Sequence, residues 1–376
     1  MAVIPLESRA SLDKRPRILL VRLSAIGDVI NTLPALGALR QRFPCAYLGW
    51  LVEDKARSVL EGHPFLDDVF VFERVRLLQE ARNPAGVLAG IRTIGRLGRR
   101  LRRARFDLLL DFHGNLKSGL LGSLAGATTR VGYDRRNSRE GNFLFNKRRV
   151  RLADSRIHRV EKHLALLEAV GIRRKGFPYV LPVPQEARAV AHSFLEKSCP
   201  GRPYAVLHPG TSAFGAHKRW HPSFFGRLAR RLIREAGLEV VVTSGPGELD
   251  LAREVAVHCG EAVGLPETRS LLELAAILEG AKVFVSADTG PMHLAAALQV
   301  PVVALFGPKD PIVYGPFGTA SRVVAAPVLC APCGGRRCAH GQCMRSICPD
   351  RVFDAVIDLL EEVRRRPAEE SLKGLP

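Results

Sequence analysis

Short apolar runs alternate with amphipathic segments along the first half of the chain. Four of these runs have the length and aliphatic character of buried parallel strands: residues 18–23, 47–52, 68–72 and 106–111. Helical periodicity is seen between them, over residues 29–43 and in a basic stretch over residues 97–105. Strands that alternate with helices predict an α/β domain built on a doubly wound parallel sheet.

The second half of the chain repeats this alternation. Strands are expected over residues 204–208, 238–243, 283–287 and 302–306, and helices over residues 222–236, 271–278 and 291–298. Pro222 suits the first turn of its helix, because a residue there needs no backbone N–H donor. Residues 172–186 lack a sustained period and are rich in proline, glycine and charge, so we place an interdomain linker there.

The length of the chain agrees with two domains. Its 376 residues exceed one ordinary core, and a hydrophobic content of 47% is sufficient for two. We expect a disordered lead-in over residues 1–16, a first Rossmann-like domain over 17–180 and a second over 181–349. The second domain includes a Cys-rich loop at 330–348, and residues 350–376 form a C-terminal helix (350–365) and a tail.

Composition limits the cellular compartment and the kinds of partner that are expected for the protein. The N-terminal stretch is polar and charged, unlike a secretion signal, and no apolar run reaches the roughly 18 residues of a membrane span. Eight cysteines without an export signal indicate reduced thiols in the cytoplasm. The formal net charge of +19 implies an anionic partner, but charge alone does not choose among nucleic acid, an anionic membrane and phosphorylated substrates.

The first candidate site follows the first predicted strand. The sequence RLSAIGD places Gly27 in a tight turn and Asp28 at the start of a helix, where open α/β sheets bind ligands. A carboxylate in that place can take a proton from a substrate hydroxyl. The alternative is that Asp28 only caps the helix, a common role for aspartate.

The second candidate site is SADTGPMH, at residues 286–293. A strand, a glycine turn and an early proline predict an exposed helix N-terminus, whose N–H groups and dipole suit a diphosphate. Thr289 adds a hydroxyl donor, and His293 lies one turn into the helix. The alternatives are that Asp288 is a cap and that His293 is a hydrogen-bonded core residue.

Two further loops follow predicted strands of the second half. HPGTS, followed by Lys218 and Arg219, is typical of a phosphate-binding loop. The alternative is a solvated loop that Trp220 anchors to its domain. In SGPGE, Glu248 is placed to accept hydrogen bonds from ribose hydroxyls, by analogy with dinucleotide-binding folds.

Taken together, these segments resemble one enzyme family. VRLSAIGDVINTLPAL, DFHGNLKSG, HPGTSAFGAHKRWHP, SGPGE and SADTGPMHLAAALQVPVVALFGPKDP stand in the order seen in glycosyltransferase family 9, the ADP-heptose:lipopolysaccharide heptosyltransferases. The resemblance runs from about Ile18 to the last helix. It implies a GT-B fold, in which two Rossmann-like domains face a central cleft.

The resemblance also implies roles for individual residues. Asp28 matches the catalytic base of an inverting transfer, and Lys218, with the helix terminus, stabilises the leaving diphosphate without a metal. The acceptor is expected to contact Ser24, Lys117 and Arg135. The positions that match the surroundings of the nucleotide sugar are Thr211, Ser212, Lys218, Glu248, Asp288, Thr289, Gly290 and His293.

The implied function is transfer of heptose from ADP-heptose to the inner core of lipopolysaccharide, on a lipid A–core acceptor. We expect a cytoplasmic enzyme, peripheral on the anionic inner leaflet, without a nucleic-acid partner. The arginines at 96–105, with Arg135, Arg136, Lys147, Arg148 and Arg149, either form a basic face toward that leaflet or are a solvated face. The alternatives are transfer of another activated sugar to a different cell-surface glycan, a catalytically silent nucleotide-sugar-binding protein, and a nucleic-acid-binding protein.

A cysteine cluster lies near the end of the second domain. Cys330, Cys333, Cys338, Cys343 and Cys348 follow the spacing C-x2-C-x4-C-x4-C-x4-C, with His340 among them. These ligand types can hold structural zinc or an iron–sulfur cluster. The spacing differs from that of a paired ribbon, and the alternative is a set of small thiols that pack a loop.

Overall fold

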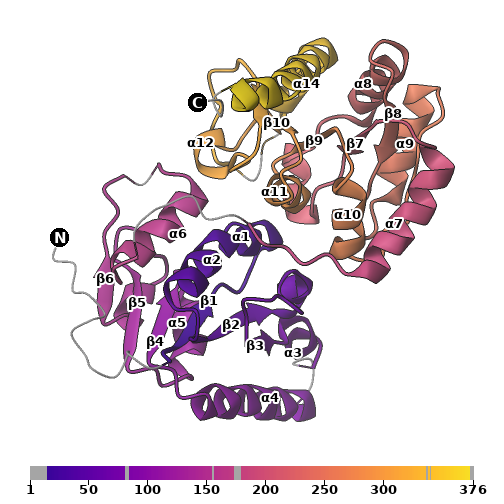
Figure 1. The fold of residues 1–376 in the computed structure, drawn as a ribbon. Helices are drawn as coiled ribbons and strands as arrows, with labels where there is room; N and C mark the ends of the chain where they lie inside the picture. The colour runs from indigo at the N-terminus through magenta and orange to yellow at the C-terminus, as the bar shows by residue number, and fades with distance from the viewer. Residues whose placement is uncertain are drawn as a thin grey trace. The chain divides into compact units, whose positions relative to one another are not determined.

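The computed structural model describes residues 15–80, 84–154, 156–172, 179–335, 338 and 340–372. The chain divides into two compact units between Pro182 and Val183. Each unit has a parallel sheet and a hydrophobic core of its own (Figure 1). The predicted lead-in up to residue 14, and residues 173–178 of the predicted linker at 172–186, lie outside the described residues.

The sheet of the first unit has six parallel strands in the order β3-β2-β1-β4-β5-β6. Their bounds are β1 Arg17–Val21, β2 Tyr47–Glu53, β3 Asp68–Phe72, β4 Leu108–Asp111, β5 Thr129–Tyr133 and β6 Arg148–Val150. The chain runs outward from β1 to β3 and returns to pair β4 with the other side of β1. The strand order therefore reverses between β1 and β4, and ligands bind at such a point in open α/β sheets.

Helices pack against this sheet because alternate strand residues point to opposite faces. Leu19 and Val21 of β1 contact Leu97 and Leu101 of the following basic helix. The helices are α1 Ile26–Ile30, α2 Leu33–Arg42, η2 Asp54–Val59, α3 Arg74–Glu80, α4 Pro84–Arg103, α5 Leu116–Ser123, η3 Asn142–Phe145 and α6 Arg159–Glu168. In Figure 1, α4 lies along one face of the unit, and α2 and α6, which pack together, lie along the other.

The sheet of the second unit has five parallel strands in the order β11-β10-β9-β7-β8. They are β7 Tyr204–His208, β8 Glu239–Val242, β9 Val283–Ala287, β10 Val302–Phe306 and β11 Ser321–Ala325. This order reverses between β7 and β9, so those two strand ends mark the ligand-binding point of the second unit.

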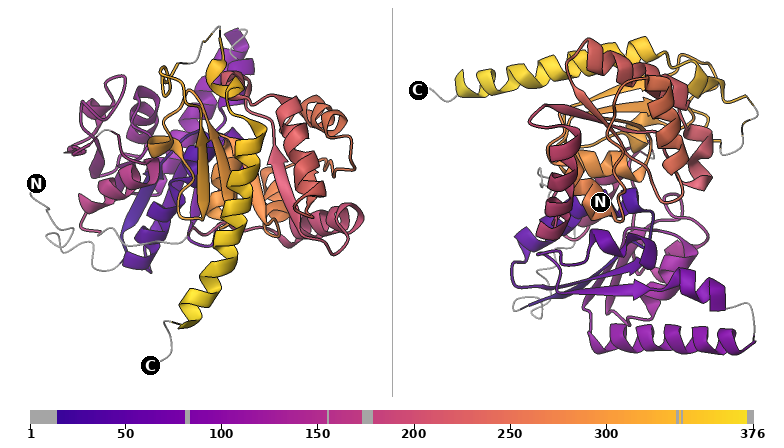
Figure 2. Two further views of the ribbon diagram at one scale, coloured as in Figure 1. Left: turned by 90° about the horizontal axis from the view of Figure 1, so that it is seen from above. Right: turned by 90° about the vertical axis from the view of Figure 1, so that its right-hand side faces the viewer.

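The helices of the second unit cover both faces of its sheet. They are α7 Gln185–Ser198, η4 Ala213–Lys218, α8 Pro222–Arg234, α9 Leu249–Cys259, α10 Leu271–Leu278, α11 Gly290–Ala297, α12 Pro311–Tyr314, α13 Gln342–Arg345 and α14 Pro349–Leu372. Figure 2 shows α14 as a long helix, and it packs beside α8 and β11. No helix in the described part of the chain is long and apolar enough to cross a membrane.

Several predicted elements need correction. The single helix expected over residues 29–43 is two helices, α1 and α2, because Pro34 lacks an N–H and is accommodated only in the first turn of α2. The basic helix begins at Pro84 rather than at residue 97, since packing on α3 and β3 outweighs the low helix propensity of its glycines. The Cys-rich loop contains the short helix α13.

Candidate functional site

Asp28 lies on α1, directly after the carboxyl end of β1. Its Oδ2 is 2.5 Å from Nη2 of Arg22, whose side chain is 5% exposed, whereas that of Asp28 is 29% exposed. The N-cap of α1 is Ala25, and no side chain caps this helix. The capping alternative for Asp28 is therefore wrong: the carboxylate is held by an arginine and is partly open to solvent.

Arg22 is itself fixed from neighbouring strands. Its Nη1 donates to the carbonyl oxygen of Phe112, just beyond β4, at 2.8 Å. Its own carbonyl accepts from Nε1 of the buried Trp50 on β2, at 3.2 Å. The guanidinium thus spans the point where β1 and β4 meet, and its position sets that of the Asp28 carboxylate.

The surroundings of Asp28 are strongly cationic. Burial, with repulsion from Arg159, Arg22 and Arg139, lowers the pKa of Lys162 to about 7. Burial, with repulsion mainly from Arg22, lowers the pKa of His113 to about 3. Nδ1 of His113 accepts from the backbone N–H of Leu23 at 3.3 Å, which suits a neutral imidazole. This edge of the sheet therefore suits an anionic ligand.

The loop that carries Lys117 is ordered by a buried carboxylate. Asp111, at the end of β4, accepts from the N–H groups of His113 and Gly114, each at 3.0 Å, and from Ser118 Oγ at 2.8 Å. Gly114 has a φ of +73°, a conformation that glycine adopts without strain. Asn115 and Ser118 then form a capping box that starts α5.

The predicted acceptor residues lie at the carboxyl edge of the first sheet, but in different settings. Lys117 forms an ion pair with the buried Glu53 at the end of β2, and Arg74 lies 3.8 Å from the same carboxylate. Ser24 is partly exposed in the β1–α1 loop. Arg135 is exposed in the turn after β5. Their contact with an acceptor stays a prediction.

In the second unit, Lys218 and Asp288 meet from the two strand ends at which the order reverses. Nζ of Lys218 is 2.8 Å from Oδ2 of Asp288 and donates to its carbonyl oxygen at 2.5 Å. Because an ammonium has three N–H donors, these two bonds leave one for a ligand. His293 Nε2 lies 3.9 Å from Oδ1 of the same carboxylate and is buried.

The N-terminus of α11 begins beside this pair. Thr289 is the N-cap, its Oγ1 accepting from the N–H of Met292 at 3.4 Å, and Gly290 is the first helical residue. The alternative in which Asp288 caps the helix is therefore wrong. The first-turn N–H groups and the helix dipole give this point the partial positive charge that suits a diphosphate.

A second network joins the other two loops. Arg219 Nη2 is 2.5 Å from Oε1 of Glu248, and that oxygen also accepts from the N–H of Thr211 at 3.1 Å. Arg219 donates in addition to the Thr211 carbonyl at 2.7 Å. A Cβ at Gly210 would lie 2.2 Å from Glu248 Oε2, so only glycine permits this close approach. Ser212 is exposed in the same loop.

The sequence alone predicts no role for Arg22, and it predicts Arg219 only as a cation of the phosphate-binding loop. The position of Arg219 between Lys218 and Trp220, in a loop after a strand, is the sequence signal for its role. Trp220 anchors its loop under both interpretations: its buried ring packs edge-on against Phe225, and Nε1 donates to the Ile347 carbonyl at 2.9 Å. Trp220 thus anchors the loop that carries both cations.

The five cysteines of the 330–348 loop differ in their exposure. Cys343 is buried, while Cys330, Cys333, Cys338 and Cys348 are exposed. Burial, and to a lesser degree the nearby Cys333, Cys338 and Cys330, raise the pKa of Cys343. Among the described residues, however, no three histidine, cysteine or acidic side chains are grouped closely enough to hold a metal ion.

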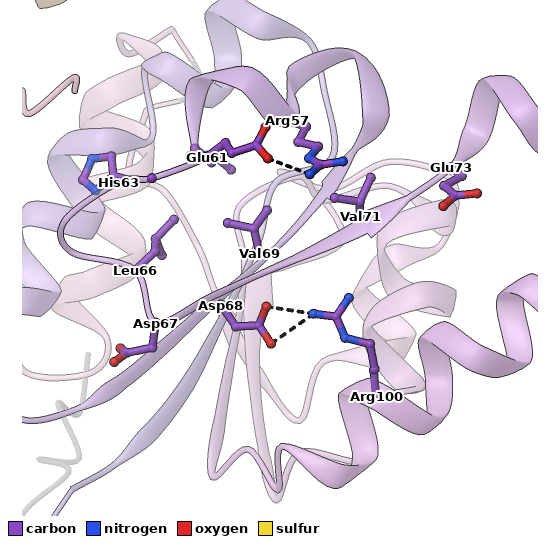
Figure 3. A pocket seen from close by; sticks show the side chains of 12 residues that line it. Arg57, Glu61, His63, Leu66, Asp67, Asp68, Val69, Val71, Glu73 and Arg100 are labelled. Carbon is purple, nitrogen blue, oxygen red and sulfur yellow. Dashed lines mark hydrogen bonds and ion pairs between the residues drawn. The ribbon is translucent and has the colours of Figure 1, made fainter. Parts of the chain in front are cut away.

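A hollow of 560 Å³ lies at the outer edge of the first sheet, beside β3. Figure 3 shows two ion pairs among its polar side chains: Arg57 with Glu61, and Arg100 with Asp68. None of the predicted site residues lines it. β3 is the edge strand away from the β1–β4 junction, so this hollow is separate from the site built around Asp28.

The two units therefore carry complementary chemistry. The first presents a fixed carboxylate in cationic surroundings, and the second presents a lysine, a helix N-terminus and a ribose-suited glutamate at its strand ends. Two Rossmann-like units with loops of this kind are the architecture of the GT-B class of glycosyltransferases.

The comparison with protein families makes the assignment specific. The model of glycosyltransferase family 9 (heptosyltransferase) matches residues 94–344. The chain belongs to glycosyltransferase family 9 and is an enzyme of that family. The family resemblance and the GT-B fold inferred from the sequence are confirmed, while the predicted residue roles, domain limits and central cleft stay predictions.

Individual relatives agree over most of the chain. Lipopolysaccharide heptosyltransferase 1 of Pseudomonas aeruginosa is 32% identical, covering 86% of this chain and 88% of the relative. Lipopolysaccharide heptosyltransferase 2 of Salmonella typhimurium is 30% identical, covering 92% and 99%. The E. coli heptosyltransferase WaaC, solved with ADP, is 25% identical with a TM-score of 0.73, covering 91% and 99%. Its complex with ADP-2-deoxy-2-fluoro heptose gives 26% identity and a TM-score of 0.68, covering 92% and 99%.

Proposed function

We propose that this protein transfers heptose from ADP-heptose to the inner core of lipopolysaccharide, with inversion at the anomeric carbon. Family membership and the names of its relatives support the heptose and the acceptor class. The ADP-containing complexes of WaaC support the nucleotide. Relatives named heptosyltransferase 1 and heptosyltransferase 2 match almost equally well, so the proposal names no core position.

One observation carries the mechanism: a solvent-accessible carboxylate, Asp28, is fixed by a buried arginine at the end of β1. In the proposed step, Asp28 takes the proton of the acceptor hydroxyl as that oxygen bonds to the anomeric carbon. The bond from this carbon to the diphosphate oxygen breaks at the same time. Attack from the face opposite the leaving group inverts the configuration, and the proton passes later from Asp28 to solvent.

The leaving diphosphate gains negative charge as its bond to the sugar breaks. Lys218, held by Asp288, and the N-terminus of α11 are proposed to stabilise that charge. These groups are fixed before the reaction and need no metal ion for this purpose. Glu248 is proposed to bind the ribose hydroxyls, and Thr211, Ser212, Thr289, Gly290 and His293 to complete the donor site.

The acceptor is proposed to be a lipid A–core molecule at the inner face of the cytoplasmic membrane. The cationic surroundings of Asp28, which include Lys117, Arg159 and Lys162, favour an anionic oligosaccharide at the carboxyl edge of the first sheet. Ser24 and Arg135 are assigned to the same face as proposed contacts. The net charge of +19 implies an anionic partner. In this proposal that partner is the anionic acceptor, and no nucleic acid is needed to explain the charge.

The proposal is tested by incubating the purified protein with ADP-heptose, ADP-glucose and UDP-glucose in parallel. The acceptors are one core lacking heptose, one carrying a single heptose and one carrying two, each followed by mass spectrometry. A mass increase of one heptose, on one acceptor and from ADP-heptose alone, supports the proposal and identifies the position. Transfer from another donor, or none with any pair, would overturn it.

A further inference from the structure

Large exposed apolar side chains gather on one small part of the first unit. Among the described residues thirteen such side chains are exposed, and five of them lie in α3 and the first half of α4: Val75, Leu78, Val87, Leu88 and Ile91. Of the other eight, Leu116, Leu120 and Leu144 lie on α5 and η3 of the first unit, and five are spread over the second unit. We call these five residues, with the arginines of α4, the α3–α4 surface. An exposed apolar group of this kind marks an interaction site more often than single apolar residues do.

The second half of α4 is cationic on its solvent side. The helix contains no acidic residue over its whole length from Pro84 to Arg103. Within the described part of the chain, only Arg100 of this helix has an acidic partner, Asp68. The six arginines of α4 are Arg92, Arg96, Arg99, Arg100, Arg102 and Arg103.

The apolar and cationic residues share one side of α4. Leu97 and Leu101 are buried against the sheet, so the opposite side of the helix faces solvent. A spacing of 3.6 residues per turn places Leu88, Gly95 and Arg99 in line on that opposite side, with Ile91 and Arg92 next to them. Along this side, aliphatic side chains in the first half of the helix are followed by arginines in the second half.

A hollow of 220 Å³ lies between α4, α3 and β3. Arg76 of α3 and Arg96 and Arg100 of α4 line it, together with apolar residues such as Ile94 and Leu97. Glu73, which pairs with Arg76 at 3.1 Å, also lines it. Because Leu97 lines it, this hollow lies on the flank of α4 toward β3 and away from the solvent side that carries Leu88 and Arg99, and its Arg100 is already paired with Asp68.

We propose that the α3–α4 surface docks the enzyme on a bilayer of anionic phospholipids. The aliphatic side chains of Leu78, Leu88 and Ile91 enter the headgroup region, and the arginines of α4 bind lipid phosphates. The absence of aromatic residues from α4 disfavours nucleic acid, whose unpaired bases are bound by stacking. The inference deepens the proposed function, since it identifies the surface by which the enzyme reaches a membrane-anchored acceptor.

The test is flotation of the full-length protein with vesicles of phosphatidylglycerol and phosphatidylcholine, and with vesicles of phosphatidylcholine alone. The wild type should float only with the anionic vesicles. Leu88→Gln/Ile91→Gln and Arg99→Glu/Arg103→Glu should each lower the partition coefficient by roughly tenfold or more. The matched controls are Val190→Gln/Val257→Gln and Arg227→Glu/Arg351→Glu, exposed on the second unit, and both should float as the wild type does.

Two results would overturn the proposal. One is normal flotation of Leu88→Gln/Ile91→Gln. This result would mean that the arginines bind polyanions in general, and binding of RNA would then be measured. The other is an equal loss with the arginine control, which would assign the effect to net charge. Transfer to an acceptor stripped of its acyl chains is measured in parallel and should be unchanged in all four variants, so a failure of the proposed function is seen separately.

Discussion

Oδ2 of Asp28 lies 2.5 Å from Nη2 of Arg22, and Nη1 of the same guanidinium is bonded to the Phe112 carbonyl beyond β4. The carboxylate is therefore tied to both strands at the point where the order of the first sheet reverses. Because Arg22 is buried, the packing of the sheet fixes the orientation of its guanidinium. The guanidinium in turn fixes the position of the Asp28 carboxylate. This relationship leads to the first prediction.

Asp28→Asn should lower turnover by on the order of a hundredfold or more, because the amide has nearly the same size but cannot take a proton. Donor affinity should change little, so the loss appears in kcat. The free energy of unfolding should fall by roughly 1–3 kcal/mol, since Arg22 loses a charged partner. Steady-state transfer assays measure kcat and the donor affinity, and thermal unfolding checks that the variant is folded.

Arg22→Gln is the companion variant. It leaves the Asp28 carboxylate in place but removes the guanidinium that holds it. We expect a smaller loss of turnover than for Asp28→Asn, because Asp28 is still present but is no longer held in one orientation. If Asp28→Asn transfers heptose at close to the wild-type rate, the base must lie elsewhere on the first unit.

The second prediction concerns Lys218. Lys218→Gln should weaken ADP binding by roughly tenfold or more, because a charge-assisted hydrogen bond to the diphosphate contributes about 1.5–3 kcal/mol. Calorimetry with chelator present measures the affinity, and Lys197→Gln, exposed on α7, is the control. Binding of ADP by the wild type only after Mg²⁺ or Mn²⁺ is added would show that the metal-free proposal is wrong.

The third prediction concerns acid stability. Burial lowers the pKa of His208 to about 4, against 6.5 in the unfolded chain. Between pH 6.5 and 4 the unfolded state binds this proton and the folded state does not, so the free energy of unfolding falls as the pH is lowered. The contribution of this residue approaches 1.4 kcal/mol per pH unit inside that window.

His208→Gln should remove that contribution, because glutamine can still bond to Thr243 but does not titrate there. Denaturant unfolding at several pH values, in a Trp50→Phe background, makes Trp220 the reporter of the second unit. His192→Gln, exposed on α7, should leave the pH dependence unchanged. Equal slopes for the wild type and His208→Gln would count against a buried neutral histidine.

The fourth prediction concerns the thiols. Cys45, Cys330, Cys333, Cys338 and Cys348 are exposed and should react quickly with a thiol reagent, whereas Cys199, Cys259 and Cys343 are buried and should react slowly. Cys338 should react first, because N–H donors from Gly341 and His340 lower its pKa. If the exposed thiols of the 330–348 loop are protected until a chelator is added, the loop holds a metal, and elemental analysis would identify it.

By itself, the sequence determined the alternation of strands and helices, because a buried parallel strand reads as an apolar run whatever its neighbours are. It also predicted which loops are candidates for the chemistry, since Asp28, Lys218, Glu248 and Asp288 each follow an expected strand. The break between α1 and α2 was readable in principle from Pro34, whereas the full length of α4 depended on packing against α3 and β3.

Only the tertiary structure decided which side chains meet. Lys218 and Asp288 are far apart in sequence, and they pair because β7 and β9 are neighbours in the sheet. Likewise, Asp28 is a carboxylate held by Arg22 and not the N-cap of its helix, because α1 begins after Ala25 and the end of β1 places the Arg22 guanidinium beside the carboxylate. A periodic pattern records which face of an element is buried, but pairing depends on strand order and register, which the local pattern does not contain.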